Sequence, residues 1–374
     1  MKAYRICTNC VMDTSDPDIT FDDNGKCNHC HKYEQSLVDR VFDPETAKVK
    51  LEQLVTQVKA HGKGKDYDCL IGVSGGVDST YVAYLVKTLG LRPLAVHLDN
   101  GWNSELAVKN IENVLTKMNI DLYTYVINWE EFRSLQLAFL KASTPDGEIP
   151  SDHAIFALLF KEAKKRGIKH IITGMNYRTE SILPKSWAQG HLDWRYVKSV
   201  NKQFGRKPLR TFPHITIGNL FYAWGIKRTK YISILNYIDY KKTEVMRVLQ
   251  DELGWKYYGG KHYESVYTRF YQSYVLPEKF NIDKRRAHLS NLILSGQVTR
   301  DEALEELKKP TCDPKIIAED IEFTTKKLQI SRQEFDEIMK LPVKSYQDYP
   351  NLEYWIQLMR KGVNLLRSKG LFSK

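Results

Sequence analysis

A short segment, residues 74–79, combines the residue types that a polyphosphate needs. Two adjacent glycines allow a tight turn that brings backbone N–H groups close to phosphate oxygens. The serine hydroxyls can donate hydrogen bonds, and an acidic side chain beside a polyphosphate is suited to hold Mg²⁺. We therefore predict that the segment binds ATP with Mg²⁺ and that its polar side chains are catalytic. It consists of Ser74, Gly75, Gly76, Val77, Asp78 and Ser79, of which Ser74, Asp78 and Ser79 are the predicted catalytic residues.

Two pairs of cysteines near the N-terminus have the spacing of a metal site. Each pair has two residues between its cysteines, and 16 residues separate the pairs. Four thiolates in two such knuckles give zinc a closed tetrahedral site, which predicts a structural role. The predicted ligands are Cys7, Cys10, Cys27 and Cys30. We expect His29 and His31 to be bystanders, and Cys69 and Cys312 to be inert packing residues.

The elements that would position these residues alternate between strand and helix. Short apolar runs predict strands at 68–73, 94–98, 122–127 and 170–173. Helical spacing of apolar residues predicts helices at 44–60, 79–89, 104–118 and 151–166. Such alternation indicates an α/β fold with a parallel sheet covered on both faces. Ligands of such sheets bind at the carboxyl ends of strands, so Asp99 and Gly174 are expected to border the nucleotide. For Asp99, a solvated loop acid is an equally good interpretation.

Composition limits the class of protein but does not select its ligand. The chain has 374 residues and a net charge of +11. We expect three parts, namely a zinc ribbon at 1–43, an ATP-binding α/β domain at 44–220 and a mainly helical substrate or partner region at 221–374. No apolar run is long enough to cross a bilayer, and the N-terminus lacks an apolar signal core, so we expect a cytoplasmic protein. The charge fits either an anionic ligand or a solvated surface.

The segment 74–79 resembles the SGGxDS signature of the PP-loop ATP pyrophosphatases. It lacks the Gly-Lys-Ser/Thr ending of a Walker loop. The resemblance implies the PP-loop fold, of the adenine nucleotide alpha hydrolase-like type, and cleavage of ATP between its α and β phosphates. With the cysteine knuckles and the stretch 259–304, the chain resembles the N-acetyl sugar amidotransferases of bacterial surface-polysaccharide and lipopolysaccharide O-antigen biosynthesis. The stretch includes Gly259-Gly260-Lys261-His262-Tyr263-Glu264-Ser265 and Asp283-Lys284-Arg285-Arg286.

This second resemblance implies conversion of an acetamido group on a sugar or sugar nucleotide to an acetamidino group. AMP transfer to the amide oxygen would create a leaving group that ammonia displaces. It also implies that ammonia comes from a separate glutaminase through a cyclase-like channel protein. The stretch 257–295 is dense in basic and aromatic residues, which fits either an anion and sugar site or helix packing with a solvated face. The candidate substrate residues are Lys261, His262, Arg269, Lys284 and Arg286.

Two other functions remain open at this stage. A PP-loop enzyme that thiolates tRNA would also combine zinc knuckles, this loop and positive charge. Such enzymes usually have catalytic or cluster-binding cysteines near the loop, and here only Cys69 is close, in a predicted buried strand. The sequence therefore does not favour a nucleic-acid partner. A non-catalytic nucleotide-binding subunit would have no need of Ser74, Asp78 and Ser79 together.

Overall fold

The structure is a computed structural model that describes residues 3–260, 263–355 and 357–358. Its centre is a five-stranded parallel sheet in the order β3-β2-β1-β4-β5. The strands are β1 (Cys69–Gly72), β2 (Pro93–Asp99), β3 (Asp121–Val126), β4 (His170–Thr173) and β5 (Lys230–Ser233). The predicted α/β fold with a parallel sheet is confirmed. The fifth strand lies in a part of the chain that we had expected to be mainly helical.

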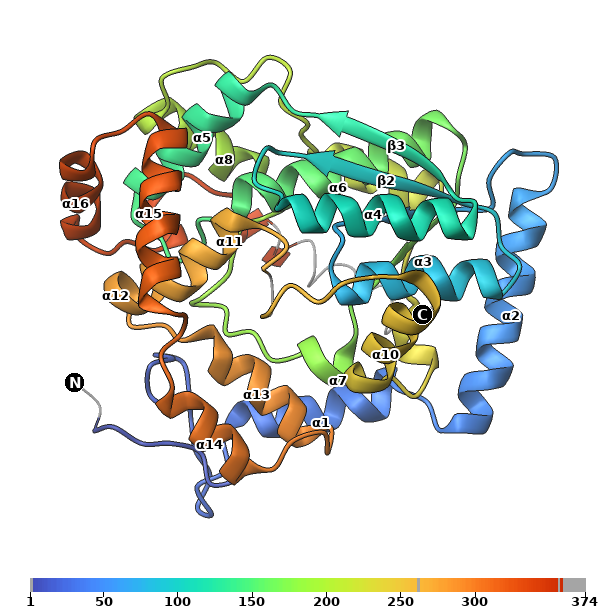
Figure 1. The fold of residues 1–374 in the computed structure, drawn as a ribbon, viewed down its shortest axis with the longest axis horizontal. Coiled ribbons are helices and arrows are strands. Elements are labelled where there is room, and N and C mark those ends of the chain that lie inside the picture. Colours follow the sequence, from blue (N-terminus) through green and yellow to red (C-terminus); the bar gives the residue numbers. More distant parts are fainter. Residues whose placement is uncertain (1–2, 261–262, 356, 359–374) are drawn as a thin grey trace.

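Alternating side chains of the strands build a separate core on each face of the sheet. On β1, Leu70 belongs to one apolar cluster and Ile71 to the other, because successive side chains of a strand point to opposite faces. The first face is covered by α5 (Trp129–Ala142) and α6 (Ile149–Lys165). The second is covered by α2 (Pro44–Gly62), α3 (Val77–Thr88), α4 (Glu105–Met118) and α10 (Lys242–Leu253). In Figure 1, α3 and α4 run side by side across that second face.

The local sequence explains where these helices begin and end. The Ser104 hydroxyl accepts a hydrogen bond from the Ala107 N–H and so caps the start of α4. The helix ends at Asn119, which adopts the left-handed conformation (φ 48°) that asparagine tolerates. Between these ends, the predicted apolar stripe is buried at Ala107, Ile111, Val114 and Leu115. The edge strand β3, by contrast, is largely exposed rather than covered on both faces.

The remaining helices of the described chain lie on both sides of β5 in the sequence. Before β5 lie α1 (Asn28–Arg40), α7 (Tyr177–Glu180), α8 (Trp194–Phe204), α9 (Ile217–Phe221) and the π-helix η1 (Tyr222–Ile226). After β5 come the 3₁₀ helix η2 (Ile234–Tyr237), α11 (Val266–Phe270), the π-helix η3 (Tyr271–Val275), α12 (Leu276–Phe280), α13 (Lys284–Leu294), α14 (Arg300–Lys308), α15 (Pro314–Leu328), α16 (Arg332–Lys340) and the 3₁₀ helix η4 (Tyr346–Asp348).

Two segments of this region have the sequence of a capping box, a serine or threonine three residues before a glutamate, and they behave differently. Thr299 and Glu302 form the reciprocal pair of hydrogen bonds at the start of α14. At α16, the Ser331 hydroxyl accepts from the Glu334 N–H, but the Glu334 carboxylate forms ion pairs with Lys141 and Arg206. The second box is thus only half formed, because two cations from distant elements attract its carboxylate.

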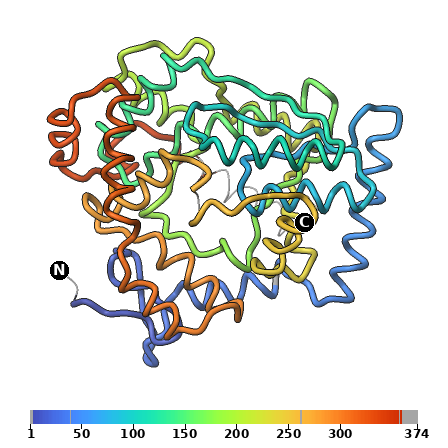
Figure 2. The backbone as a smooth tube through the Cα atoms, viewed as in Figure 1, coloured from blue at the N-terminus to red at the C-terminus, as the bar shows by residue number. Residues whose placement is uncertain are grey.

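The first residues of the chain lie against helices from its C-terminal third. Figure 2 shows the N-terminal segment, in blue, beside the orange helices of the second half of the chain. Hydrogen bonds join the two parts: the Val11 N–H donates to the Ser290 hydroxyl of α13 at 3.2 Å, and Arg300 of α14 donates to the carbonyl oxygens of Cys7 and Cys10 at 2.8 and 3.1 Å. The cysteine segment is therefore held against α13 and α14 by hydrogen bonds.

Candidate nucleotide site and metal cluster

The phosphate loop, residues 74–79, connects β1 to α3, as predicted. Gly75 has φ +81°, a conformation that favours glycine, and a Cβ on this residue would lie 2.5 Å from the carbonyl oxygen of Ala107 in α4. Both the backbone conformation and the contact therefore require glycine here. The loop can lie this close to α4 only because Gly75 has no side chain.

The loop presents hydrogen-bond donors at the start of α3. The Ser74 and Ser79 hydroxyl oxygens are 3.1 Å apart, and the Gly76 N–H donates to the Ser74 hydroxyl at 3.3 Å. Gly76 precedes the helix and has no side chain to cap it. The first N–H groups of a 12-residue helix, with the positive end of its dipole, suit an anion such as phosphate.

Asp78 lies at the point where the order of the sheet reverses. From β1 the chain runs to β2 and β3 on one side, and it returns to β4 and β5 on the other. Ligands of open α/β sheets bind at this point. Gly174, directly after β4, packs against Asp78 so closely that a Cβ would lie 2.9 Å from the Asp78 carbonyl carbon. The structure thus brings together two predicted site residues from different strands.

The carboxylate of Asp78 is oriented by a tyrosine that sequence reasoning missed. The buried Tyr240 hydroxyl donates a hydrogen bond to Asp78 Oδ1. Burial, together with the negative charge of Asp78, raises the pKa of Tyr240, so this group stays a donor at any physiological pH. A carboxylate is the kind of oxygen ligand that Mg²⁺ prefers, so Asp78 fits the predicted ion.

Two more aromatic residues hold the loop from the segment after α10. Trp255 Nε1 donates to the Gly75 carbonyl oxygen at 3.0 Å, and the Val77 N–H donates to the Tyr258 hydroxyl at 3.3 Å. Both side chains come from residues 255–258, where the sequence has three aromatic residues in four positions. The density of aromatic residues marks this segment as unusual, but nothing in the sequence indicates that it contacts a loop 180 residues away.

Asp99 ends β2, and its carboxylate is used within its own turn. Its Oδ1 accepts from the Gly101 N–H at 2.9 Å. The nearby Lys327 ammonium donates to the Gly101 carbonyl oxygen and lies 5.2 Å from the ring centroids of Trp102 and Trp129. Burial lowers the pKa of Lys327, and the charge of Asp99 opposes that change. A role for Asp99 toward the nucleotide stays a prediction.

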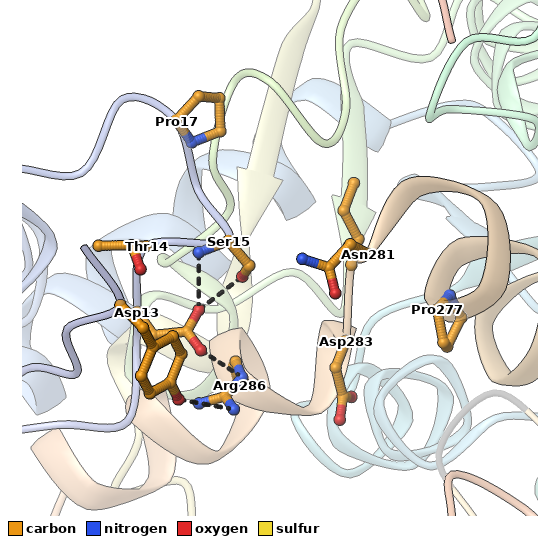
Figure 3. Close-up of a pocket in the computed structure, with 10 residues that line it drawn as sticks. Asp13, Thr14, Ser15, Pro17, Pro277, Asn281, Asp283 and Arg286 are labelled. Atoms are coloured by element: carbon orange, nitrogen blue, oxygen red, sulfur yellow. Dashed lines mark hydrogen bonds and ion pairs between the residues drawn. The ribbon is translucent and has the colours of Figure 1, made fainter. Parts of the chain in front are cut away.

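The candidate substrate residues are dispersed. Lys261 and His262 lie outside the described residues. Arg269 forms a bidentate pair with Asp320, with both N–O distances at 2.7 Å. Arg286 contacts Asp13 at 3.0 Å, beside a cleft of about 640 Å³ (Figure 3). These two arginines therefore connect helices to neighbouring segments.

Lys284 instead belongs to an acidic cluster with Asp146, Glu148 and Asp152, which sequence reasoning missed. Its ammonium is 3.3 Å from Glu148, and Asp146 and Asp152 lie in the same short stretch as Glu148. Burial alone would lower the pKa of Lys284, but the nearby carboxylates have the larger effect, so its pKa is raised. Burial raises the pKa of Asp146 to about 6. A buried carboxyl with such a pKa can accept a proton near neutral pH.

This acidic cluster adjoins the carboxyl ends of the strands. Asn100, which follows β2, donates to the Ser151 hydroxyl at 3.0 Å at the start of α6. On the other side, burial and the charge of Asp152 raise the pKa of Tyr231 on β5, to about 12. The acidic side chains therefore lie on the edge of the sheet that carries the phosphate loop.

The four N-terminal cysteines form a single buried cluster. Their sulfur atoms lie within 4.8 Å of one another, and three of the S–S distances are 3.7 to 3.8 Å. A tetrahedron with zinc–sulfur bonds of about 2.3 Å has S–S edges of about 3.8 Å, so the cluster has the size of a zinc site. The N–H groups of Asn9, Cys10 and Cys27 donate to the Cys7 sulfur at 3.2 to 3.4 Å, which favours a thiolate.

The two histidines of this segment and the two remaining cysteines of the chain lie outside the cluster. His29 Nε2 is 2.6 Å from Asp16, and His31 Nε2 is 2.9 Å from Asp22, so both rings are engaged with carboxylates. Cys69 is buried in β1, where burial raises the pKa of its thiol. Cys312 is buried between α14 and α15 and accepts a hydrogen bond from the Tyr263 hydroxyl at 3.2 Å. Neither thiol is exposed.

Several known proteins are similar to parts of this chain. Over 64 residues it is 36% identical to a tRNA(Ile)-lysidine synthase of Chlamydia pneumoniae, which is 17% of this chain and 20% of that protein. Over 123 residues it is 28% identical to the tRNA-specific 2-thiouridylase MnmA of Staphylococcus epidermidis, which is 29% of this chain and 33% of that protein. The chain spans about a fifth to a third of the length of these curated relatives.

Two solved structures resemble the chain over a larger share of its length. An NMN synthetase from Francisella tularensis has a TM-score of 0.32 and 15% identity, with coverage of 81% of this chain and 98% of that one. An NH3-dependent NAD synthetase from Campylobacter jejuni has a TM-score of 0.30 and 15% identity, with coverage of 81% and 99%.

A family model matches the segment that begins beside the phosphate loop. Its description is LPS biosynthesis protein WbpG-like, C-terminal domain, and it matches residues 264–361. The first residues of this segment pair with the turn after β2: the Ser104 N–H donates to the Glu264 carbonyl oxygen at 2.8 Å, and the Val266 N–H donates to the Trp102 carbonyl oxygen at 2.9 Å. The predicted resemblance to a surface-polysaccharide family is confirmed over this segment, and residues 264–361 are similar to the C-terminal domain of WbpG-like proteins of lipopolysaccharide biosynthesis.

Proposed function

We propose that the chain is an ATP-dependent amidotransferase that converts an acetamido group of a sugar or sugar nucleotide to an acetamidino group. One observation carries the proposal: the WbpG-like segment begins at the phosphate loop. A Cβ on Gly76 would lie 3.1 Å from Glu264 Oε1, so a loop suited to ATP and a domain of lipopolysaccharide biosynthesis share one site. A sugar held by that domain would meet the α-phosphate of ATP there.

In the proposed reaction the amide oxygen of the sugar attacks the α-phosphate of ATP and displaces pyrophosphate. Ammonia then adds to the carbon of the adenylated imidate, and AMP leaves with the original oxygen. The loop N–H groups and the hydroxyls of Ser74 and Ser79 would bind the phosphates, and Asp78 would hold Mg²⁺, which neutralises the charge on the departing pyrophosphate. Positioning and electrostatics are sufficient for this chemistry, so no nucleophile from the protein is needed.

We place three functional parts along the chain. Residues 1–43 would be a structural zinc ribbon, residues 44–220 an ATP-binding domain, and residues 221–374 a region for substrate and partner. Ammonia would come from a separate glutaminase through a cyclase-like channel protein. The acidic cluster at Asp146, Glu148 and Asp152 is suited to receive ammonium, and Asp146, whose pKa is raised by burial, could take up its proton.

A tRNA-thiolating enzyme is the second candidate, supported by the partial similarity to MnmA. A thiolation reaction needs a reactive sulfur close to the nucleotide. The cysteine that is closest to the loop in sequence, Cys69, begins β1 at the strand end opposite the loop and is fully buried. The site geometry therefore favours the sugar amidotransferase.

The test is a product analysis with the full chain, Mg-ATP, ammonium salt and a panel of N-acetyl and di-N-acetyl sugars and sugar nucleotides. We expect AMP and pyrophosphate only with an accepted sugar, and a product in which NH replaces one oxygen, seen by mass spectrometry. ADP as the nucleotide product, or thiolation of added tRNA with no change in any sugar, would contradict the proposal.

A further inference from the structure

One continuous stretch of the chain carries a large net positive charge. Residues 194–238 contain nine lysines and arginines and no aspartate or glutamate, in a chain whose net charge is +11. All nine basic side chains are exposed. The aromatic residues that hold the phosphate loop, Tyr240, Trp255 and Tyr258, all lie outside this stretch.

Within that stretch, α9 and η1 present large apolar side chains to solvent. Phe221, Trp224 and Ile226 are 69%, 50% and 63% exposed, although they lie within six residues of each other. A π-helix is uncommon and here widens the turn at Tyr222–Ile226. Trp224 also contacts α6, because its ring centroid is 6.1 Å from that of Phe160. Three large exposed apolar groups so close together indicate a contact surface.

A hollow of about 310 Å³ lies between this segment and the C-terminal half of α6. Its lining includes apolar groups such as Ile168 and Ala223, four lysines and no carboxylate. None of the four lysines forms an ion pair within the part of the chain that the structure describes. The nearest acid of α6, Glu162, is buried and is paired with Arg166. The lysines are Lys161, Lys164, Lys169 and Lys227.

We propose that this basic-aromatic patch, made of Phe221, Trp224, Ile226 and the four lysines of the hollow, docks the protein on the surface of an anionic lipid bilayer. Aromatic and aliphatic side chains insert at the boundary between head groups and acyl chains, while lysines bind the anionic head groups. This combination matches a bilayer on both counts, in apolar character and in charge.

The same features fit other anionic partners less well. Single-stranded RNA binds to aromatic rings that lie flat for stacking, but an exposed isoleucine offers no such ring. Among the residues that the structure describes, no helix is both long and apolar enough to pass through a membrane. The proposed contact is therefore peripheral and reversible, and it weakens at high salt.

The test is co-sedimentation of the full chain with vesicles. We expect binding to phosphatidylcholine vesicles that contain phosphatidylglycerol, no binding to pure phosphatidylcholine, and loss of binding at high salt. Phe221→Ser/Trp224→Ser/Ile226→Ser should weaken binding about tenfold or more. The matched control is Val126→Ser, a change at another exposed apolar residue, which should leave binding intact.

A second pair of variants tests the charge. Lys164→Glu/Lys227→Glu should abolish binding to anionic vesicles, whereas Lys48→Glu/Lys109→Glu, with the same change in net charge on α2 and α4, should not. Equal loss in both double variants would show a general charge effect and overturn the proposal. So would vesicle binding that persists in the triple variant, or binding to tRNA without binding to vesicles. Circular dichroism of each variant distinguishes loss of binding from loss of folding.

Discussion

Asp78 has two neighbours that fix the direction of its carboxylate. The Tyr240 hydroxyl donates to it, and Gly174 leaves room for its backbone. The carboxylate therefore stays at the start of α3, where the order of the sheet reverses. If Asp78 binds the Mg²⁺ of the proposed reaction, a carboxylate held in this way would need little reorganisation.

We expect Asp78→Asn to lower the rate of AMP formation by about a hundredfold or more, because an amide is a poor ligand for Mg²⁺. The asparagine oxygen can still accept from Tyr240, so the fold should be kept. Tyr240→Phe keeps the carboxylate and removes only the hydroxyl that orients it, so its loss should be smaller, about tenfold. Steady-state assays that detect pyrophosphate compare the two. Near wild-type turnover of Asp78→Asn would show that this carboxylate does not bind an essential metal.

The buried Asp146 predicts a pH-dependent stability. Burial raises the pKa of its carboxyl from 3.8 to about 6, so the folded protein favours the protonated form. The stability from this preference is complete below pH 3.8 and is lost as the pH rises through 6. Asp146→Asn removes the buried charge. We expect its gain in the free energy of unfolding to grow from near zero below about pH 4 to about 2–3 kcal/mol above pH 7.

Urea titrations at several pH values measure this difference. The control is Asp66→Asn, which removes the same charge from an exposed side chain and should give no comparable gain. If Asp146→Asn changed the free energy of unfolding equally at low and high pH, burial would not be raising the pKa of this carboxyl.

At the scale of elements, the sequence was sufficient for the sheet strands with strong apolar runs and for the loop between β1 and α3. It also predicted the cysteine cluster, because metal spacing is a local property. It did not predict β5, since Lys230 and Ser233 give that strand polar ends. Nor did it predict that Tyr240, Trp255 and Tyr258 hold the phosphate loop. Such contacts join residues more than 150 positions apart, and local patterns contain no information about them.

Gly75 connects the loop to α4, and its replacement tests that contact. In Gly75→Ala the new Cβ would meet the Ala107 carbonyl oxygen and would also impose a strained backbone conformation. Gly64→Ala is the matched control, because Gly64 has φ +76° but no atom within 4 Å of the added Cβ. We expect Gly64→Ala to cost about 1 kcal/mol from strain alone. Gly75→Ala should cost more and reduce ATP turnover, as measured by urea unfolding and pyrophosphate release.

The cysteine cluster gives a prediction about metal content. We expect one zinc per chain by elemental analysis. Cys7→Ser, or removal of zinc by a chelator, should lower the melting temperature by on the order of 5 °C or more, because thiolate–zinc bonds stabilise this segment. Cys312→Ser changes a buried thiol outside the cluster and should keep the zinc. Less than half an equivalent of zinc in freshly purified protein would contradict a structural zinc site.

At the scale of the whole molecule, the supply of nitrogen is the open requirement. A glutaminase of the cysteine type needs an accessible thiol beside a base. All six cysteines of this chain are buried, and four of them form the cluster. None of these cysteines fits that role, so we expect the ammonia of the proposed reaction to come from outside the chain.

We expect the isolated chain to form AMP with ammonium salts and not with glutamine. The rate at subsaturating ammonium should rise with pH, because only the deprotonated form is nucleophilic. Addition of a suitable glutaminase partner should restore use of glutamine. Parallel assays with ammonium alone and with glutamine alone test this expectation. Efficient turnover of the isolated chain with glutamine alone would contradict it.

The hydrogen bonds between Arg300 and the carbonyl oxygens of Cys7 and Cys10 also order the events of biosynthesis. Arg300 is 293 residues from Cys7 in the chain, so the cysteine segment is synthesised long before the helix that it contacts. Until α13 and α14 have been made, Val11 lacks Leu289 and Ala303, with which it is buried in the finished protein. If the four cysteines acquire their metal early, they would wait as a preformed knuckle for these late partners. Contacts between residues far apart in the sequence slow folding, so docking of the cysteine segment on α13 and α14 is expected to be the slow step in maturation.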